Sequence, residues 1–116
     1  MHEVTTKPLS LARLKTLILE DSKLKLSVEV IQKIQECRAY LDQKIATTSD
    51  PIYGINTGFG ALCDVRIHSE NLTKLQENLV RSHACGTGDL VPKSIIKLML
   101  LLKIKALSYG HSGVQL

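Results

Sequence analysis

The spacing of apolar residues predicts a chain built mainly from α-helices. Leu14, Leu17 and Ile18 share one side of residues 10–20, and Ser10 can act as the N-cap of this first helix. The first helix is therefore expected to bury one narrow apolar face.

A second helix is expected over residues 27–45, after a polar, extended connection at residues 21–26. Ser27 is a good N-cap, and the polar cluster that leads into Pro51 ends the helix. Between these limits apolar residues recur at the three-to-four spacing of a helix with one buried face. They are Val30, Ile34, Cys37, Leu41 and Ile45.

A third helix is expected after residues 62–67, which can be briefly extended. Ser69 can cap this helix, and Glu70 in its first turn suits the positive end of the helix dipole. The apolar stripe of the helix ends at His83, and the glycines of residues 86–88 stop it.

A fourth helix is expected from Pro92, which suits a first helical turn, to about Tyr109 before Gly110. Almost no polar face remains on it. Its apolar residues are Ile95, Ile96, Leu98, Met99, Leu100, Leu101, Leu102, Ile104, Ala106 and Leu107. A helix that is apolar nearly all round is normally buried on every side, and three other helices cannot easily surround it. We therefore expect further protein around it, from a C-terminal portion or from partner subunits.

Composition narrows the class of protein. The 116 residues carry a net charge of +4, but no three basic residues adjoin, so nucleic-acid binding is not favoured. Cys37, Cys63 and Cys85 are odd in number and form no C-x-x-C pair, which fits a reducing cytoplasm rather than a disulfide framework. No signal peptide is recognisable, and the longest apolar run, 98–102, is too short to span a bilayer. A soluble cytoplasmic protein is the default expectation.

The segment Tyr53–Gly60, YGINTGFG, holds three glycines and suits neither a helix nor an ordinary strand. Its glycines match neither a dinucleotide-binding fingerprint nor a P-loop, so nucleotide binding is not favoured. Two interpretations stay open from the residues alone. The segment can be a turn between helices, or a loop whose glycines let the main chain approach a ligand, with the Tyr53 hydroxyl at its edge.

His83, at the end of an apolar stripe, is by itself best explained as a histidine bonded to the backbone or favoured by the helix dipole. His83 and Cys85 lack a third ligand nearby, and the other histidines show no useful spacing with them. We therefore expect no metal site.

Four blocks in order resemble the N-terminal part of the histidine ammonia-lyases, within the aromatic amino acid ammonia-lyase family. They are Tyr53–Gly60 (YGINTGFG), Leu75–Leu79 (LQENL), Ser82–Gly88 (SHACGTG) and Gly110–Val114 (GHSGV). The resemblance runs from about residue 9 to the last residue. It implies the mainly α-helical, aspartase/fumarase-like architecture of that family, with residues 1–116 as the N-terminal part of one larger domain and 51–62 as an active-site loop.

The resemblance also implies a function. Family members are homotetramers that eliminate ammonia from an L-amino acid, here L-histidine giving trans-urocanate. By resemblance Tyr53 is the acid/base residue that takes the β-proton, and His83 contacts the substrate side chain. Asn56 and Gly60 are expected to bind substrate, while Gly54 and Gly58 shape the loop. Neither a nucleic-acid nor a membrane partner is expected.

The family's electrophile is a 4-methylidene-imidazol-5-one made from an internal Ala-Ser-Gly triplet. No such triplet occurs in these residues; Ala84-Cys85-Gly86 and His111-Ser112-Gly113 only imitate it. The chain is therefore expected to be an N-terminal fragment, incomplete as a domain and inactive alone.

Three other functions stay open. A tyrosine ammonia-lyase or related aminomutase can also carry a histidine at position 83, although Ser82 and Ala84 favour the histidine enzyme. A stand-alone helical module could bury the fourth helix by self-association. A small basic nucleic-acid binder is the least favoured.

Overall fold

The computed structural model describes residues 1–116 and confirms the mainly α-helical class. The chain forms two compact units, one of residues 1–44 and 90–116 and one of residues 45–89. Four helices carry most of the structure: α1 (Leu11–Leu19), α2 (Val28–Thr47), α3 (Leu72–His83) and α4 (Lys93–Leu107). None of them is long and apolar enough to cross a bilayer.

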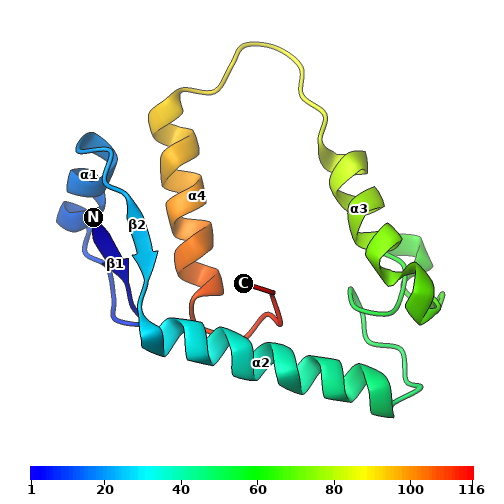
Figure 1. Ribbon diagram of the computed structural model, residues 1–116. Coiled ribbons are helices and arrows are strands. Elements are labelled where there is room, and N and C mark those ends of the chain that lie inside the picture. Colours follow the sequence, from blue (N-terminus) through cyan, green and yellow to red (C-terminus); the bar gives the residue numbers. More distant parts are fainter. The chain divides into compact units, whose positions relative to one another are not determined.

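The first unit also contains a small parallel sheet that the sequence pattern did not predict. Strand β1 (His2–Val4) pairs with β2 (Leu24–Leu26), and α1 forms the crossover between them (Figure 1). The expected connection at residues 21–26 is therefore partly strand. Only three residues of each strand pair, which is too short for a period-two pattern to be recognised.

The predicted caps of the first two helices are confirmed. Ser10 Oγ accepts a hydrogen bond from Arg13 N at 3.2 Å, and Ser27 Oγ accepts one from Val30 N at 3.3 Å. These bonds satisfy main-chain donors that have no partner within the helix. The expected cap of the third helix is wrong, because Ser69 begins a 3-10 turn, η2 (Ser69–Asn71), and Asn71 takes the N-cap position of α3.

The core of the first unit is small and draws on β1, α1, α2 and α4. Its buried apolar residues are Val4, Leu17, Val30, Ile34 and Leu101. On α2 the buried face is thus confirmed for Val30 and Ile34, and the helix runs two residues beyond the expected end at Ile45.

Helix α4 packs against α1 but leaves most of its apolar surface in solvent. Leu101 is its one buried residue, whereas Met99 is 60% exposed and Leu100 59% exposed. An apolar surface of this kind on a helix is unusual for a complete soluble fold.

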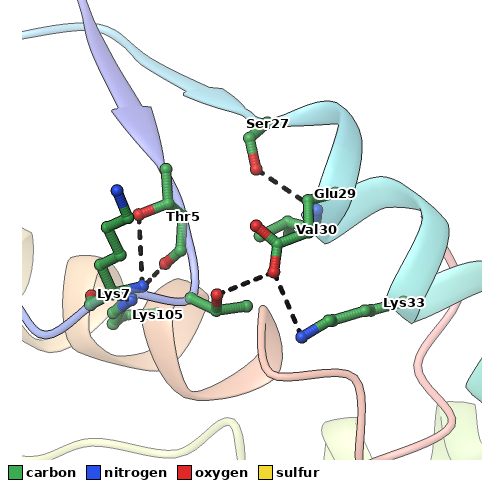
Figure 2. A network of polar contacts seen from close by, with 8 residues as sticks. Thr5, Lys7, Ser27, Glu29, Val30, Lys33 and Lys105 are labelled. Carbon is green, nitrogen blue, oxygen red and sulfur yellow. Dashed lines mark hydrogen bonds and ion pairs between the residues drawn. The ribbon is translucent and has the colours of Figure 1, made fainter.

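Polar contacts fasten the N-terminal segment to α2 and α4 (Figure 2). Lys105 Nζ donates to the main-chain carbonyls of Thr5 and Lys7, the second at 2.7 Å. Thr6 Oγ1 donates to Glu29 Oε1 at 2.9 Å, and Lys33 forms an ion pair with the same carboxylate at 3.2 Å. The hydrogen bond from Thr6, followed by the contact with Lys33, holds the pKa of Glu29 below its ordinary value.

The segment after α4 packs against α2 through glycines. Gly110 has a φ of 72°, and a Cβ there would lie 2.8 Å from the carbonyl oxygen of Lys33. The Gly113 carbonyl accepts from Arg38 Nη1 at 3.3 Å. This block of the sequence thus has a packing role in the first unit.

Candidate active-site loop

The second unit is built around the glycine segment, which folds into a compact loop. The isolated bridge between Thr57 and Arg66 closes this loop, with Gly58 N donating to Val65 O at 2.9 Å and Ile67 N to Asn56 O at 2.8 Å. The polar side chains of Asn56 and Thr57 are buried in it, 4% and 0% exposed. The expected loop of residues 51–62 therefore extends to Ile67 as a single hydrogen-bonded structure.

Asn56 is the most heavily bonded residue of the loop. Its Oδ1 accepts from Ile52 N at 2.6 Å, and its Nδ2 donates to Asp50 O at 3.0 Å. Its main-chain N donates to Ile52 O at 3.1 Å. All of its observed contacts lie within the second unit, and its assignment to substrate binding stays a prediction.

The side chain of Tyr53 is largely exposed, in contrast to those of Asn56 and Thr57. Its side chain is 65% exposed, and its ring meets the edge of the Phe59 ring at a centroid distance of 6.0 Å. The phenol is therefore carried by an ordered main chain while its hydroxyl stays accessible.

The three glycines of the loop serve different geometric needs. Gly54 has a φ of 74°, a value that side chains other than glycine rarely adopt. Gly58 is required for space, since a Cβ there would lie 2.7 Å from both Cβ and O of Leu62. Gly60, with a φ of 56°, begins the 3-10 turn η1 (Gly60–Leu62), and nothing lies within 4 Å of where its Cβ would be.

Helix α3 meets the loop through Gln76, whose Nε2 donates to the carbonyl of Gly54 at 3.4 Å. His83 follows Gln76 by seven residues, so the two side chains share one face of the helix, about 10 Å apart along its axis. The loop that carries Tyr53 is thus attached to the same face of α3 from which His83 projects.

The ring of His83 is oriented by its own helix. Its Nδ1 lies 2.9 Å from the carbonyl oxygen of Leu79 and 3.0 Å from Ser82 Oγ. A carbonyl oxygen only accepts, so the bond to Leu79 requires the proton on Nδ1. In the neutral ring Nε2 is then an unprotonated acceptor at the exposed end of the side chain.

Comparison with known proteins identifies the family of the chain. A sequence model of the family described as "Aromatic amino acid lyase" matches residues 9–116. The chain belongs to the aromatic amino acid lyase family.

Individual relatives support the same membership. A histidine ammonia-lyase of Legionella pneumophila (strain Paris) is 44% identical over 108 residues, which are 93% of this chain and 21% of the relative. The crystal structure of histidine ammonia-lyase from Trypanosoma cruzi superposes with a TM-score of 0.82 at 31% identity, covering 98% of this chain and 22% of that one. Tyrosine aminomutase from Streptomyces globisporus gives a TM-score of 0.87 at 29% identity, over 97% and 21%. The chain therefore spans about a fifth of the length of the relatives that it matches.

In this aromatic amino acid lyase chain, every residue that the sequence nominated for the site falls in the second unit. They are Tyr53, Gly54, Asn56, Gly58, Gly60 and His83. Gln76 was not among the residues expected in the site, although it lies in the LQENL block, because a hydrogen bond from a helix to a loop leaves no periodic signal in the sequence. No group of three His, Cys, Asp or Glu side chains is placed to hold a metal ion.

Proposed function

We propose that this chain is the N-terminal part of a histidine ammonia-lyase, a carbon-nitrogen lyase that converts L-histidine into trans-urocanate and ammonia. The observation that carries the proposal is the attachment of the Tyr53 loop, through Gln76, to the α3 face that bears His83. A proton-transfer group and a group that can recognise an imidazole then belong to one structural unit. The histidine ammonia-lyases among the sequence relatives support this substrate over others.

Tyr53 is proposed to remove the β-proton of the substrate. A tyrosine hydroxyl has a reference pKa of about 10, so this role needs surroundings that stabilise the phenolate. The open space beside Gly60 leaves room for a substrate to approach.

His83 is proposed to bind the substrate side chain. With the proton held on Nδ1 by the Leu79 carbonyl, its Nε2 can accept a hydrogen bond from the N–H of the substrate imidazole. An acceptor at this point favours side chains that donate and disfavours a plain phenyl ring, which would leave Nε2 unpaired.

The residues present do not supply the methylidene-imidazolone that the family resemblance implies. No Ala-Ser-Gly triplet occurs among them, and the middle residue of the nearest imitation is Cys85. The group would have to come from elsewhere in the parent protein, so the fragment is proposed to be inactive alone. Tyr53 is accordingly assigned to proton transfer alone, and His83 to substrate binding alone.

The exposed apolar surface of α4 supports a larger assembly. Met99 and Leu100, each more than half exposed, need cover from further protein, which we propose to be the remainder of the same domain and partner subunits of a homotetramer. The three cysteines are unpaired, which fits a cytoplasmic enzyme.

A tyrosine ammonia-lyase or aminomutase is the second candidate. The likeness to tyrosine aminomutase favours it, and so does Nε2 of His83, which can accept equally from a phenol hydroxyl. The phenol and the imidazole are therefore not distinguished by this acceptor alone.

The deciding experiment gives the full-length protein L-histidine and L-tyrosine separately and follows urocanate, 4-hydroxycinnamate and β-tyrosine. We expect urocanate from L-histidine, with Tyr53→Phe lowering kcat by about 10²- to 10⁴-fold because the proton acceptor is lost. The second variant, His83→Leu, is expected to raise the KM for L-histidine, because it removes the proposed substrate contact. Products from tyrosine but none from histidine would transfer the assignment to the second candidate.

A further inference from the structure

Tyr53 lies between two residues that are each held by a side-chain amide. On one side, Ile52 N donates to Asn56 Oδ1 at 2.6 Å. On the other, the carbonyl of Gly54 accepts from Gln76 Nε2 at 3.4 Å. The main chain is therefore hydrogen-bonded immediately before and immediately after the tyrosine, with the shorter bond on the Ile52 side.

The bond from Asn56 is part of a wider bridge across Pro51. Its Nδ2 donates to Asp50 O at 3.0 Å, so one side chain satisfies an acceptor before the proline and a donor after it. Proline has no N–H, so the main chain of Pro51 itself cannot donate a hydrogen bond between these two positions. The Asn56 side chain is 4% exposed, which makes these bonds costly to lose because water does not readily replace them.

The tyrosine ring itself is held by little else. It is 65% exposed, and its aromatic contact is the edge of Phe59. Within residues 1–116 its direction is therefore set mainly by the main chain of residues 52–54, together with the Phe59 contact.

We propose that Asn56 is a positioning residue, which fixes the direction of Tyr53 through Ile52 and Asp50 without touching the substrate. The proposal rests on the proposed proton-transfer role of Tyr53, and it gives Asn56 a different role from the substrate contact expected from the sequence. The two side-chain bonds of Asn56, to Ile52 N and to Asp50 O, are called the clamp below. It fits the general requirement that a reacting group be held to within a fraction of an ångström.

The experiment compares three variants of the full-length enzyme. Asn56→Ala removes both side-chain bonds, whereas Asn56→Asp keeps an acceptor for Ile52 N but opposes a carboxylate to the carbonyl of Asp50. Asn71→Asp is the matched control, since Asn71 is an exposed N-cap residue of α3 whose side chain makes no capping bond.

Hydrogen exchange of the Ile52 amide is the readout that does not depend on activity. In Asn56→Ala we expect exchange, corrected for intrinsic rates, to rise about tenfold or more at every pH, and in the control to stay unchanged. In Asn56→Asp the acceleration is expected to fade as pH drops, because a protonated carboxyl regains one donor and one acceptor. Burial raises the pKa of a carboxyl, so this recovery is expected above pH 4.

Steady-state kinetics then test the link to Tyr53. Asn56→Ala is expected to lower kcat by about 10- to 100-fold with KM within about threefold of wild type, since the base is misdirected while binding is intact. For Asn56→Asp, kcat relative to wild type is expected to recover over the same pH range as the exchange.

Each result that contradicts the proposal excludes a different part of it. Unchanged exchange at Ile52 in Asn56→Ala would refute the clamp, and changed exchange with unchanged kcat would refute positioning. A rise in KM alone would make Asn56 a substrate contact. If Asn56→Ala does not fold, the pH series of Asn56→Asp carries the test. A wild-type protein without lyase activity would remove the proposed function, while the exchange data would still decide whether the clamp exists.

Discussion

Replacing Gly58 by alanine tests whether the glycine loop has the close packing that the structure describes. A Cβ at this position would lie 2.7 Å from Leu62 Cβ and 2.7 Å from Leu62 O. Non-bonded carbon atoms are best separated by about 3.5–4.0 Å. One of the two atoms in conflict belongs to the main chain of η1, so a change of rotamer cannot relieve the overlap.

The free-energy cost of Gly58→Ala follows from the movement that is needed to relieve the overlap with Leu62. Separating the new methyl group from Leu62 requires a shift of most of an ångström between the two parts of the loop. Overpacking of this size costs about 1–3 kcal/mol. The same shift strains the hydrogen bond from Gly58 N to Val65 O, now 2.9 Å, which adds about 1 kcal/mol. Gly58→Ala is therefore expected to destabilise the loop by about 2–4 kcal/mol.

Two other glycines provide matched comparisons. Gly60 has a φ of 56° but nothing within 4 Å of its Cβ position, so Gly60→Ala should cost about 1–2 kcal/mol from the left-handed backbone alone. Gly86 has neither a positive φ nor a neighbour in that range, and Gly86→Ala should change stability by less than about 0.5 kcal/mol.

Hydrogen exchange at the amides of Gly58 or its replacement and of Ile67 measures the opening of the loop, because both donate bonds that close it. In the full-length protein, Gly58→Ala should accelerate this exchange by about 30- to 1000-fold and Gly60→Ala by about 5- to 30-fold. Gly86→Ala should leave it nearly unchanged. Equal exchange in the Gly58 and Gly60 variants would refute the reasoning, since it would mean that η1 yields at little cost.

Two further predictions concern the first unit. Ser27→Ala should destabilise the protein by about 1 kcal/mol, because Val30 N loses the acceptor that caps α2. Thermal unfolding measures this loss, and Ser49→Ala, at an exposed position, is the control. Desolvation, followed by the charges of Arg13 and Lys105, lowers the pKa of His2 below 6.5. The unfolded state therefore binds more protons than the folded state as pH falls through 6.5, and the pairing of β1 with β2 should weaken below that pH. Hydrogen exchange at the Ser27 amide, which donates to Val4 O, should then accelerate in the wild type. In His2→Gln this acceleration should be absent.

The helices and their first two caps could be predicted because the determining interactions are local. Ser10 and Ser27 each bond to an N–H three residues ahead, so the cap and its partner lie within one turn of sequence. The cap of α3 was mistaken because Ser69 and Asn71 are both suitable residues two positions apart, and only the conformation of η2 decides between them.

The strand pair could not be predicted for a physical reason. The register joins His2 to Leu24 and Val4 to Leu26, across more than twenty residues. Strand pairing of this kind depends on where α1 returns the chain, and three residues carry no alternation of their own. The same limit applies to Gln76, whose bond to Gly54 also spans more than twenty positions.

The glycine loop combines two properties that usually oppose each other. Its polar residues Asn56 and Thr57 are buried and bonded, as in a rigid turn, while Tyr53 between the bonded segments is largely exposed. Connecting two helices does not require a buried asparagine and threonine, because water can satisfy the same groups at the surface. Internal hydrogen bonds become useful when an exposed group must keep one direction, since within residues 1–116 the Tyr53 ring has little packing beyond the edge of Phe59 to orient it. The glycines then follow as a consequence: Gly54 permits the backbone turn after the tyrosine, and Gly58 permits the close approach of η1 that completes the loop.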